Sequence, residues 1–231
     1  MDAPTARPRK SRRERPAKPA LTYDGIVSTA VALVGSEGLE RLTMRRLAAE
    51  LDTGPASLYV YVANTAELHA AILDVFLGEV ALSPVAAAQD WRDRLVAVLI
   101  SYTEVLIRHA ALAQSALTAR PSGPHYLAVL ENLLTLLRAG GVPDGQAAWG
   151  VDILLQVATA TAVEQSVRDR DTAVTGNEDA ALRQALDTAA DRSHPRIAAL
   201  HDDLVSGSPE DRLNWTFQML ITGIQNTARP H

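Results

Sequence analysis

The sequence predicts an all-α protein in which a small N-terminal unit of three helices precedes a larger helical bundle. Apolar residues recur at spacings of three and four through most of the chain, as they do on one face of an amphipathic helix. No stretch alternates between apolar and polar residues like a strand, and short Gly- and Pro-containing segments separate the periodic stretches. The chain has 231 residues, which is long enough to bury a sizeable core.

Composition excludes several classes of site and of location. The chain has no cysteine, which rules out disulfides, thiolate zinc sites and cysteine nucleophiles. Its first residues lack the apolar run of a signal peptide, and no uninterrupted apolar run approaches the roughly 20 residues needed to span a membrane. We therefore expect a soluble, cytoplasmic protein.

The formal net charge of −5 is distributed unevenly along the chain. Residues 1–68 carry a net charge of +2, whereas residues 69–231 carry −7. A protein that binds DNA needs only a local positive surface, so the acidic total does not exclude DNA binding by the N-terminal part.

Residues 1–21 form a basic arm with very little apolar content. The arm holds four prolines and seven basic residues, against only two acidic ones. Such a segment cannot bury enough apolar surface to fold alone, so we expect it to be disordered in the free protein. Two interpretations stay open: the arm is a solvated tail, or it lies along DNA phosphates or in the minor groove.

The first predicted helix begins at Thr22 or Asp24, either of which can cap it, and ends at about Gly38. Its buried stripe follows the spacing i, i+4, i+7 and i+8 and consists of Ile26, Ala30, Leu33 and Val34. This helix would brace the two helices that follow it.

The next 20 residues or so read as a helix, a tight turn and a second helix. Thr43 is a good N-cap for the first of these helices, whose apolar face consists of Met44, Leu47, Ala48 and Leu51. The turn is Asp52-Thr53-Gly54, and Pro55 suits the first position of the second helix, residues 56–61. This geometry places one helix in the DNA major groove, and Arg45 and Arg46 lie off the apolar face, where they can reach a phosphate.

The remaining chain predicts helices of the body. A helix from Thr65 to about Leu82 should end at Ser83-Pro84, and apolar stripes follow from Trp91 to Leu106 and from Tyr126 to Leu137. A helix over residues 144–168 is apolar nearly all round, and a helix over 209–227 carries a second stripe of Trp215 and Met219. The surplus apolar surface on these two helices predicts a subunit interface. Between them we expect a loop at 169–178 and one or two polar helices at 179–204, split near His194-Pro195.

Residues 24–68 resemble a known family. The first helix, DGIVSTAVALVGSEGLERLT, is followed by MRRLAAELDTGPASLYVYVANTAEL, in which ASLYVYV precedes N-x-x-E-L. This pattern resembles the tetracycline-repressor-like (TetR) family of transcriptional regulators. The resemblance implies a helix-turn-helix DNA-binding domain at residues 22–68, behind the arm at 1–21, and a helical ligand-binding and dimerisation domain at 69–231.

The resemblance also implies roles for residues around the turn. The expected DNA contacts are Thr43, Arg45, Arg46, Pro55, Ala56, Ser57, Tyr59, Val60 and Tyr61. Of these, Thr43 and Arg45 would contact phosphates or groove edges, with Arg46 close by. Pro55, Ala56 and Ser57 would face base edges, Tyr59 and Tyr61 would touch the DNA backbone, and Val60 would meet a thymine methyl group. Asp52, Thr53 and Thr65 depart from the family pattern, and Thr65 replaces a lysine that would contact phosphate.

The function implied is that of a homodimeric regulator, expected to be a repressor released from double-stranded operator DNA by a small-molecule effector. In the family, the effector binds in the helical body and changes the separation of the two DNA-reading units. The polar or aromatic residues placed on the helices that would line this pocket are Tyr102, Gln114, Tyr126, Trp149, Gln156 and Glu164.

Two other classes of function are compatible with a helical chain of this kind. An enzyme is disfavoured, because none of the six histidines has a metal-ligand spacing such as H-E-x-x-H, and no phosphate-binding loop or G-x-S-x-G is present. His109 reads as a helix C-cap or a pocket group, and we expect no catalytic residue, metal site or cofactor. A helical protein-interaction module that has lost DNA binding is the other alternative, left open by Thr65.

Overall fold

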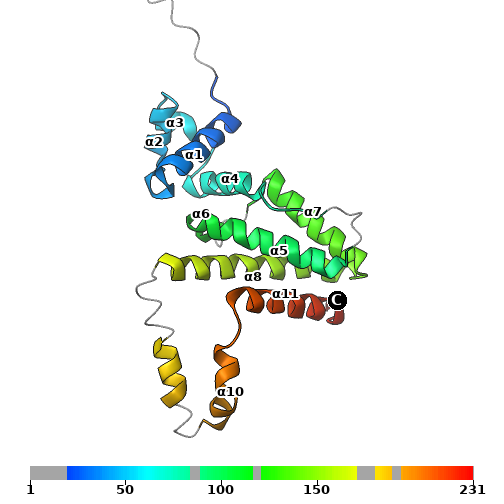
Figure 1. Ribbon diagram of the computed structural model, residues 1–231. Coiled ribbons are helices and arrows are strands. Elements are labelled where there is room, and N and C mark those ends of the chain that lie inside the picture. Colours follow the sequence, from blue (N-terminus) through cyan, green and yellow to red (C-terminus); the bar gives the residue numbers. More distant parts are fainter. Residues whose placement is uncertain (1–19, 84–88, 117–120, 171–179, 189–193, 231) are drawn as a thin grey trace, which may run out of the picture.

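The computed structural model describes residues 20–83, 89–116, 121–170, 180–188 and 194–230, and every regular element within them is helical. Figure 1 shows the N-terminal helices at one end of the molecule and α10 at the other. The all-α class predicted from the sequence is confirmed for these residues. The predicted disorder of the arm concerns residues that lie almost wholly outside the described ranges.

The N-terminal unit, called the head below, consists of residues 20–62. It contains α1 (Tyr23–Glu37), the short 3-10 helix η1 (Leu39–Arg41), α2 (Met44–Glu50) and α3 (Pro55–Leu58). Thr22 is the cap of α1, because its hydroxyl accepts a hydrogen bond of 3.1 Å from the backbone N–H of Gly25. The fully buried core of the head is made by Ile26, Ala30, Leu47, Leu58 and Val62. Leu51, expected in this core, is half-buried against it.

The second helix of the motif is shorter than predicted. We expected residues 56–61, but α3 ends at Leu58 and the chain continues in a tight turn. The carbonyl of Leu58 accepts hydrogen bonds from the N–H groups of Tyr61 at 2.9 Å and Val62 at 3.0 Å. This turn buries both Leu58 and Val62 while residues 59–61 stay on the outside.

Asp52 makes the turn between α2 and α3 with a left-handed backbone, at φ 48°. The N–H of Asp52 bonds to the carbonyl of Ala49 at 3.1 Å, and that of Thr53 bonds to Ala48 at 2.8 Å. These bonds end α2, and Asp52 occupies the left-handed position in which glycine is usually found after a helix. Aspartate tolerates this conformation better than most residues, so the departure from the family pattern is accommodated.

Helix α4 (Thr65–Leu77) leads from the head into the body. Asn64 accepts a 2.9 Å hydrogen bond from the N–H of Glu67, and the Glu67 carboxylate accepts one of 2.6 Å from the N–H of Ala63. These two bonds at the start of α4 are the physical reason for the N-x-x-E spacing. The helix ends at Leu77, with Gly78 as its C-cap, instead of at Leu82, because Val80 packs into the core and the N–H of Ser83 bonds to Asn132 at 3.1 Å.

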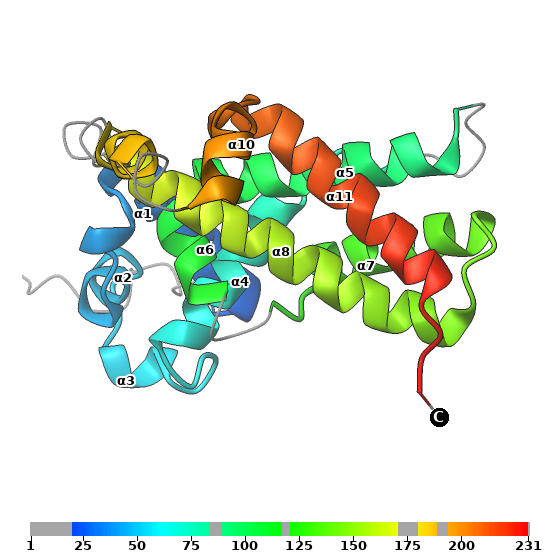
Figure 2. The ribbon, with the colours of Figure 1, turned by 90° about the horizontal axis from the view of Figure 1, so that it is seen from below.

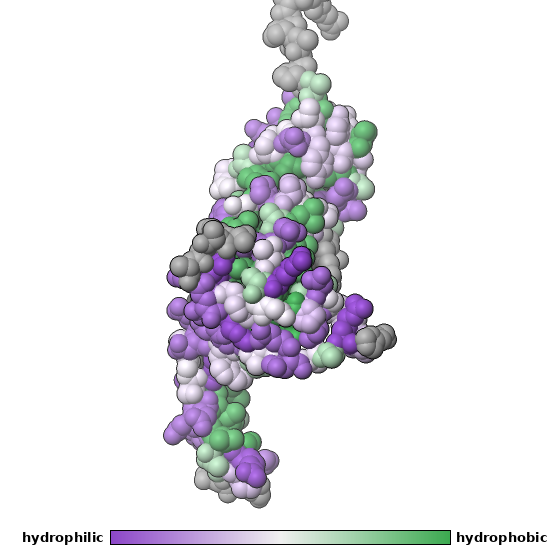
Figure 3. Space-filling model, turned by 90° about the vertical axis from the view of Figure 1, so that its right-hand side faces the viewer, coloured by the Kyte–Doolittle hydropathy of each residue, from purple (hydrophilic) through white to green (hydrophobic). Residues whose placement is uncertain are grey.

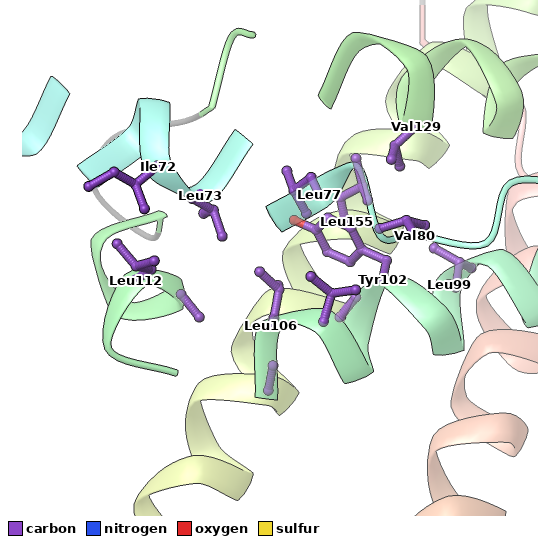
Figure 4. Close-up of a cluster of buried hydrophobic side chains, with 14 of the residues drawn as sticks. Ile72, Leu73, Leu77, Val80, Leu99, Tyr102, Leu106, Leu112, Val129 and Leu155 are labelled. Carbon is purple, nitrogen blue, oxygen red and sulfur yellow. The ribbon is translucent and has the colours of Figure 1, made fainter. Parts of the chain in front are cut away.

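The body is built around α5 (Trp91–Arg108), which packs against α7 (Pro124–Ala139), α8 (Asp144–Arg170) and α11 (Pro209–Asn226). The short α6 (Ala110–Ala116) lies against α4 and α8. In Figure 4, side chains of α4, α5, α6, α7 and α8 point toward one another, and Tyr102, Leu99 and Leu106 of α5 are at most 2% exposed. Figure 2 shows α11 alongside α8, where Gly150 leaves room for Ile224.

Beyond the body, the chain forms a helix at residues 180–188 and α10 (Pro195–Val205). The predicted break near His194-Pro195 is confirmed, because α10 starts at Pro195. Figure 3 shows hydrophobic surface on this outlying part, which carries the exposed side chains of Leu182, Leu200 and Leu204. Among the described helices, none has the length and apolar character required to cross a membrane.

Candidate nucleic-acid interface and subunit face

The DNA-binding candidates of α3 and the turn after it lie together on the outside of the head. Pro55, Ala56 and Ser57 are exposed on the first turn of α3. They are followed by Tyr59 and Val60, with 51% and 81% of their surfaces exposed. Because Leu58 and Val62 anchor the opposite side in the core, these residues form an outward-facing surface that a DNA groove can receive.

Thr43 and Arg45 sit at the start of α2. The Thr43 hydroxyl caps the helix by accepting a 3.0 Å hydrogen bond from the N–H of Arg46. The side chain of Arg45 is exposed and forms no ion pair with any described residue. Its guanidinium is therefore available to a phosphate.

Arg46 has a different environment from the one expected. Its guanidinium forms ion pairs with Glu37 at 2.5 Å and with Glu50 at 2.8 Å. The hydrogen bond from Arg46 lowers the pKa of the Glu37 carboxyl. A phosphate would have to compete with two carboxylates, so the geometry favours a role in joining α2 to the end of α1. The Arg46–Glu50 spacing of four residues is readable from the sequence, whereas the Glu37 contact is not.

Tyr61 connects the motif to the chain that precedes α1. Its side chain is 37% exposed, and its hydroxyl donates a 2.7 Å hydrogen bond to the carbonyl of Leu21. Leu21, the last residue before the cap of α1, is therefore held at the turn that follows α3.

A second exposed surface, called the subunit face below, lies on α8 and α11. It consists of four large apolar side chains, Trp149, Ile153, Trp215 and Met219, which are 42–68% exposed. The guanidinium of Arg229 lies 5.2 Å from the Trp149 ring, and a cavity of about 350 Å³ opens between the two helices. Clustered exposed side chains of this size are typical of a protein contact surface.

The six candidate pocket residues do not gather around one cavity in the described part of the chain. Tyr102 is buried, and its hydroxyl lies 3.1 Å from that of Thr159; burial raises the pKa of Tyr102 to about 12. Trp149 belongs to the subunit face, and Gln114, Gln156 and Glu164 are exposed.

Tyr126, the last of the six, is half-buried at the start of α7, where its N–H bonds to Asp74 at 2.9 Å. Helical spacing placed the six residues on body helices but did not indicate which way each side chain faces. Their role as effector contacts stays a prediction.

Two larger cavities lie where the head meets the body. One, of about 510 Å³, has walls from the end of α1, from α4 and from the junction of α5 with α6. In its wall the rings of Phe76 and His109 stack with centroids 3.6 Å apart. His109 is also the C-cap of α5, as expected, and loss of solvent lowers its pKa. The second cavity, of about 560 Å³, lies between α1, α4 and the start of α7.

These observations place a helix-turn-helix unit ahead of a helical body, and the same order appears in known proteins. Residues 26–72 match the family described as bacterial regulatory proteins, tetR family, and residues 83–228 match the tetracyclin repressor-like, C-terminal domain. The chain belongs to the TetR family. It is a transcriptional regulator of that family, and the resemblance seen in residues 24–68 is confirmed.

Relatives of this TetR-family regulator match it over most of its length. A transcriptional regulator of Saccharopolyspora erythraea is 32% identical, over 96% of this chain and 91% of its own. The transcriptional repressor DrrR1 of Streptomyces coeruleorubidus is 31% identical, over 93% and 81%.

Solved structures extend the similarity to three dimensions. A Streptomyces protein, the putative transcription regulator SCO7704, is 55% identical, with a TM-score of 0.77 over 93% of this chain and 99% of that one. ActR of Streptomyces coelicolor is 35% identical in its apo form, with a TM-score of 0.75 over 89% of this chain and 95% of that one. ActR has also been solved in complex with actinorhodin.

Proposed function

We propose that this regulator is a cytoplasmic, homodimeric repressor that binds double-stranded operator DNA and is released by a small-molecule effector. The observation that carries the proposal is the exposed surface of α3 and its following turn, which presents Ser57, Tyr59 and Val60 over a fully buried Leu58. Burial of these apolar and aromatic side chains would stabilise the free protein, whereas a helix that enters the major groove must keep them exposed.

Dimerisation would complete the DNA-reading geometry. The subunit face supplies an apolar contact on α8 and α11, far from the head. Two heads related by twofold symmetry and about 34 Å apart would place their α3 helices in successive major grooves of a near-palindromic site. The exposed Arg45 and Thr43 would fix the heads on the phosphates.

Release by an effector is supported by the ligand complexes of a relative. ActR, 34% identical to this chain, has been solved with actinorhodin. For release, an effector must bind the conformation that does not fit DNA more tightly than the one that does. A preference of about 2.7 kcal/mol corresponds to roughly a hundredfold loss of operator affinity.

A titration with the DNA upstream of the protein's own gene tests this proposal. We expect a specific complex whose affinity falls steeply as salt is raised, because each neutralised phosphate contributes about 0.9 to the log–log slope. A scrambled duplex of the same composition is the control. Equal affinity for both duplexes, or no complex at low salt, would favour the alternative of an interaction module that has lost DNA binding.

A further inference from the structure

Helix α4 carries one buried acidic side chain on the face that it turns to the body. Leu68, Ile72, Leu73 and Leu77 make up the apolar part of this face, and Asp74 lies among them with 5% of its surface exposed. Within the described ranges, no other carboxylate is buried. A charge in this position requires strong partners.

The partners of Asp74 belong to the first turn of α7, about 50 residues further along the chain. One carboxylate oxygen accepts a 2.9 Å hydrogen bond from the N–H of Tyr126. The other lies 3.3 Å from the N–H of His125 and 3.1 Å from its Nδ1. These two N–H groups occupy the second and third positions of α7, which an N-cap side chain normally satisfies. Pro124, at the first position, has no N–H to satisfy.

Two glycines make this close approach possible. Gly123 is the N-cap residue of α7 and provides no side-chain cap, and a Cβ atom there would overlap the Asp74 carboxylate. At the end of α4, a Cβ on Gly78 would lie 3.0 Å from the His125 ring. The first turn of α7 is therefore held against α4 by the hydrogen bonds to Asp74. The absence of a side chain at Gly78 leaves room for the His125 ring.

We propose that Asp74 is a positioning residue that makes α4, and with it the head, move together with α7. A serine or asparagine at position 123 would have capped α7 locally. The chain instead has glycine there and places the capping group on the helix that leads to the head. Helix α7 is anchored in the body by the buried Val129, Leu133 and Leu137. A rearrangement of the body therefore reaches the head through this connection, which gives the release step of the proposed function a route.

A distance measurement within one chain tests the proposal. The sequence has no cysteine, so spin labels can be attached at two introduced ones, Ala49→Cys on α2 and Glu131→Cys on α7, both exposed positions. Doubly labelled protein is diluted into an excess of unlabelled protein, so that pulsed electron paramagnetic resonance reports only the head-to-body distance of a single chain. We expect a narrow distribution for the otherwise unchanged chain and a clearly broader one after Asp74→Ala.

A second variant separates positioning from helix capping. In Asp74→Ala the carboxylate is gone, so Gly123→Ser can be added to give α7 its own N-cap. We expect the double variant to recover much of the melting temperature lost by Asp74→Ala while its distance distribution stays broad. A narrow distribution in the double variant, or in Asp74→Ala itself, would show that Asp74 only stabilises α7 and would overturn the proposal.

Operator binding gives an independent readout. If the DNA-competent head orientation falls to about a quarter of the population in Asp74→Ala, the apparent Kd rises about fourfold, with the salt slope unchanged. Failure of the unsubstituted chain to bind its operator would refute the proposed function. The distance measurement needs no DNA and would still decide the role of Asp74.

Discussion

The hydroxyl of Tyr61 donates a 2.7 Å hydrogen bond to the carbonyl oxygen of Leu21. The two residues are 40 positions apart, and the bond joins the end of the helix-turn-helix to the chain just ahead of α1. Leu21, the last residue of the arm, is thus fixed next to the proposed DNA surface.

Replacing Tyr61 with phenylalanine removes this bond and little else. Because the bond is exposed, we expect the free energy of unfolding to fall by no more than about 1 kcal/mol in a urea titration. If the arm lies on DNA, the free energy of operator binding should weaken by more than the free energy of unfolding does. In a chain that lacks residues 1–20, Tyr61→Phe should then cost less affinity than in the full chain, and an equal cost in both would assign Tyr61 a direct DNA contact.

Deletion of residues 1–20 distinguishes the two interpretations of the arm. An arm that lies along phosphates adds about 0.9 to the salt slope for each phosphate neutralised, so its loss should lower the slope by several units. The slope is measured from operator affinity at a series of salt concentrations. An unchanged slope would identify the arm as a solvated tail.

Arg45 and Arg46 are adjacent in sequence but should respond differently to substitution. We expect Arg45→Ala to weaken operator binding and to lower the salt slope by about 0.9 without changing the melting temperature, since its guanidinium has no ion pair within the described residues. Arg46→Ala breaks the ion pairs with Glu37 and Glu50 and should lower the melting temperature. If Arg46→Ala changed only the salt slope, Arg46 would instead be a phosphate contact.

His109 should make stability depend on pH. Loss of solvent lowers its pKa in the folded protein, and Arg108 adds to this, while Glu79 opposes it. Neutral His109 is therefore favoured in the folded state. Its contribution to the free energy of unfolding is present above the ordinary pKa of 6.5 and is lost as the pH falls through the lower pKa of the folded protein. His109→Phe keeps a ring against Phe76 and should reduce the fall in melting temperature below pH 6.5. An unchanged pH profile in this variant would show that His109 does not contribute.

The subunit face predicts which substitutions produce monomers. Trp215 is 68% exposed on α11, and a glutamate there would place a charge in an apolar contact. We expect Trp215→Glu to sediment near the mass of one chain, 24.8 kDa, while the unsubstituted protein sediments near twice that mass. Leu200→Glu on α10, at a residue that is 49% exposed, is the matched control and should stay dimeric. Monomer formation by the control, or a dimer of Trp215→Glu, would place the contact elsewhere.

The head could be predicted from sequence because its signals are local. Thr22 and Thr43 cap their helices within three residues, and Asp52 adopts the turn conformation that the sequence requires of it. The helix α4 was predicted to be too long for a local reason as well. Apolar residues continue past Gly78, but Val80 is buried while its backbone forms a turn and not a helix.

The surroundings of the candidate pocket residues could not be predicted in the same way. Tyr102 and Trp149 both lie on body helices that carry apolar stripes, yet one is in the core and the other is on the surface. Their difference arises from packing between helices that are distant in sequence. The contact of Asp74 with the first turn of α7, and the closeness of Gly123 that permits it, are equally invisible until the two helices are placed together.

Footprinting on the DNA upstream of the gene tests most directly whether two α3 helices read an operator. We expect a near-palindromic protected region whose two half-sites have centres about 10 base pairs, or a multiple of that, apart. Trp215→Glu should lose this protection because it no longer forms the dimer. Tyr59→Ala should stay dimeric and lose the protection because it removes a proposed DNA contact. No protected region, or equal protection by the Tyr59→Ala variant, would contradict a regulator that reads DNA through α3.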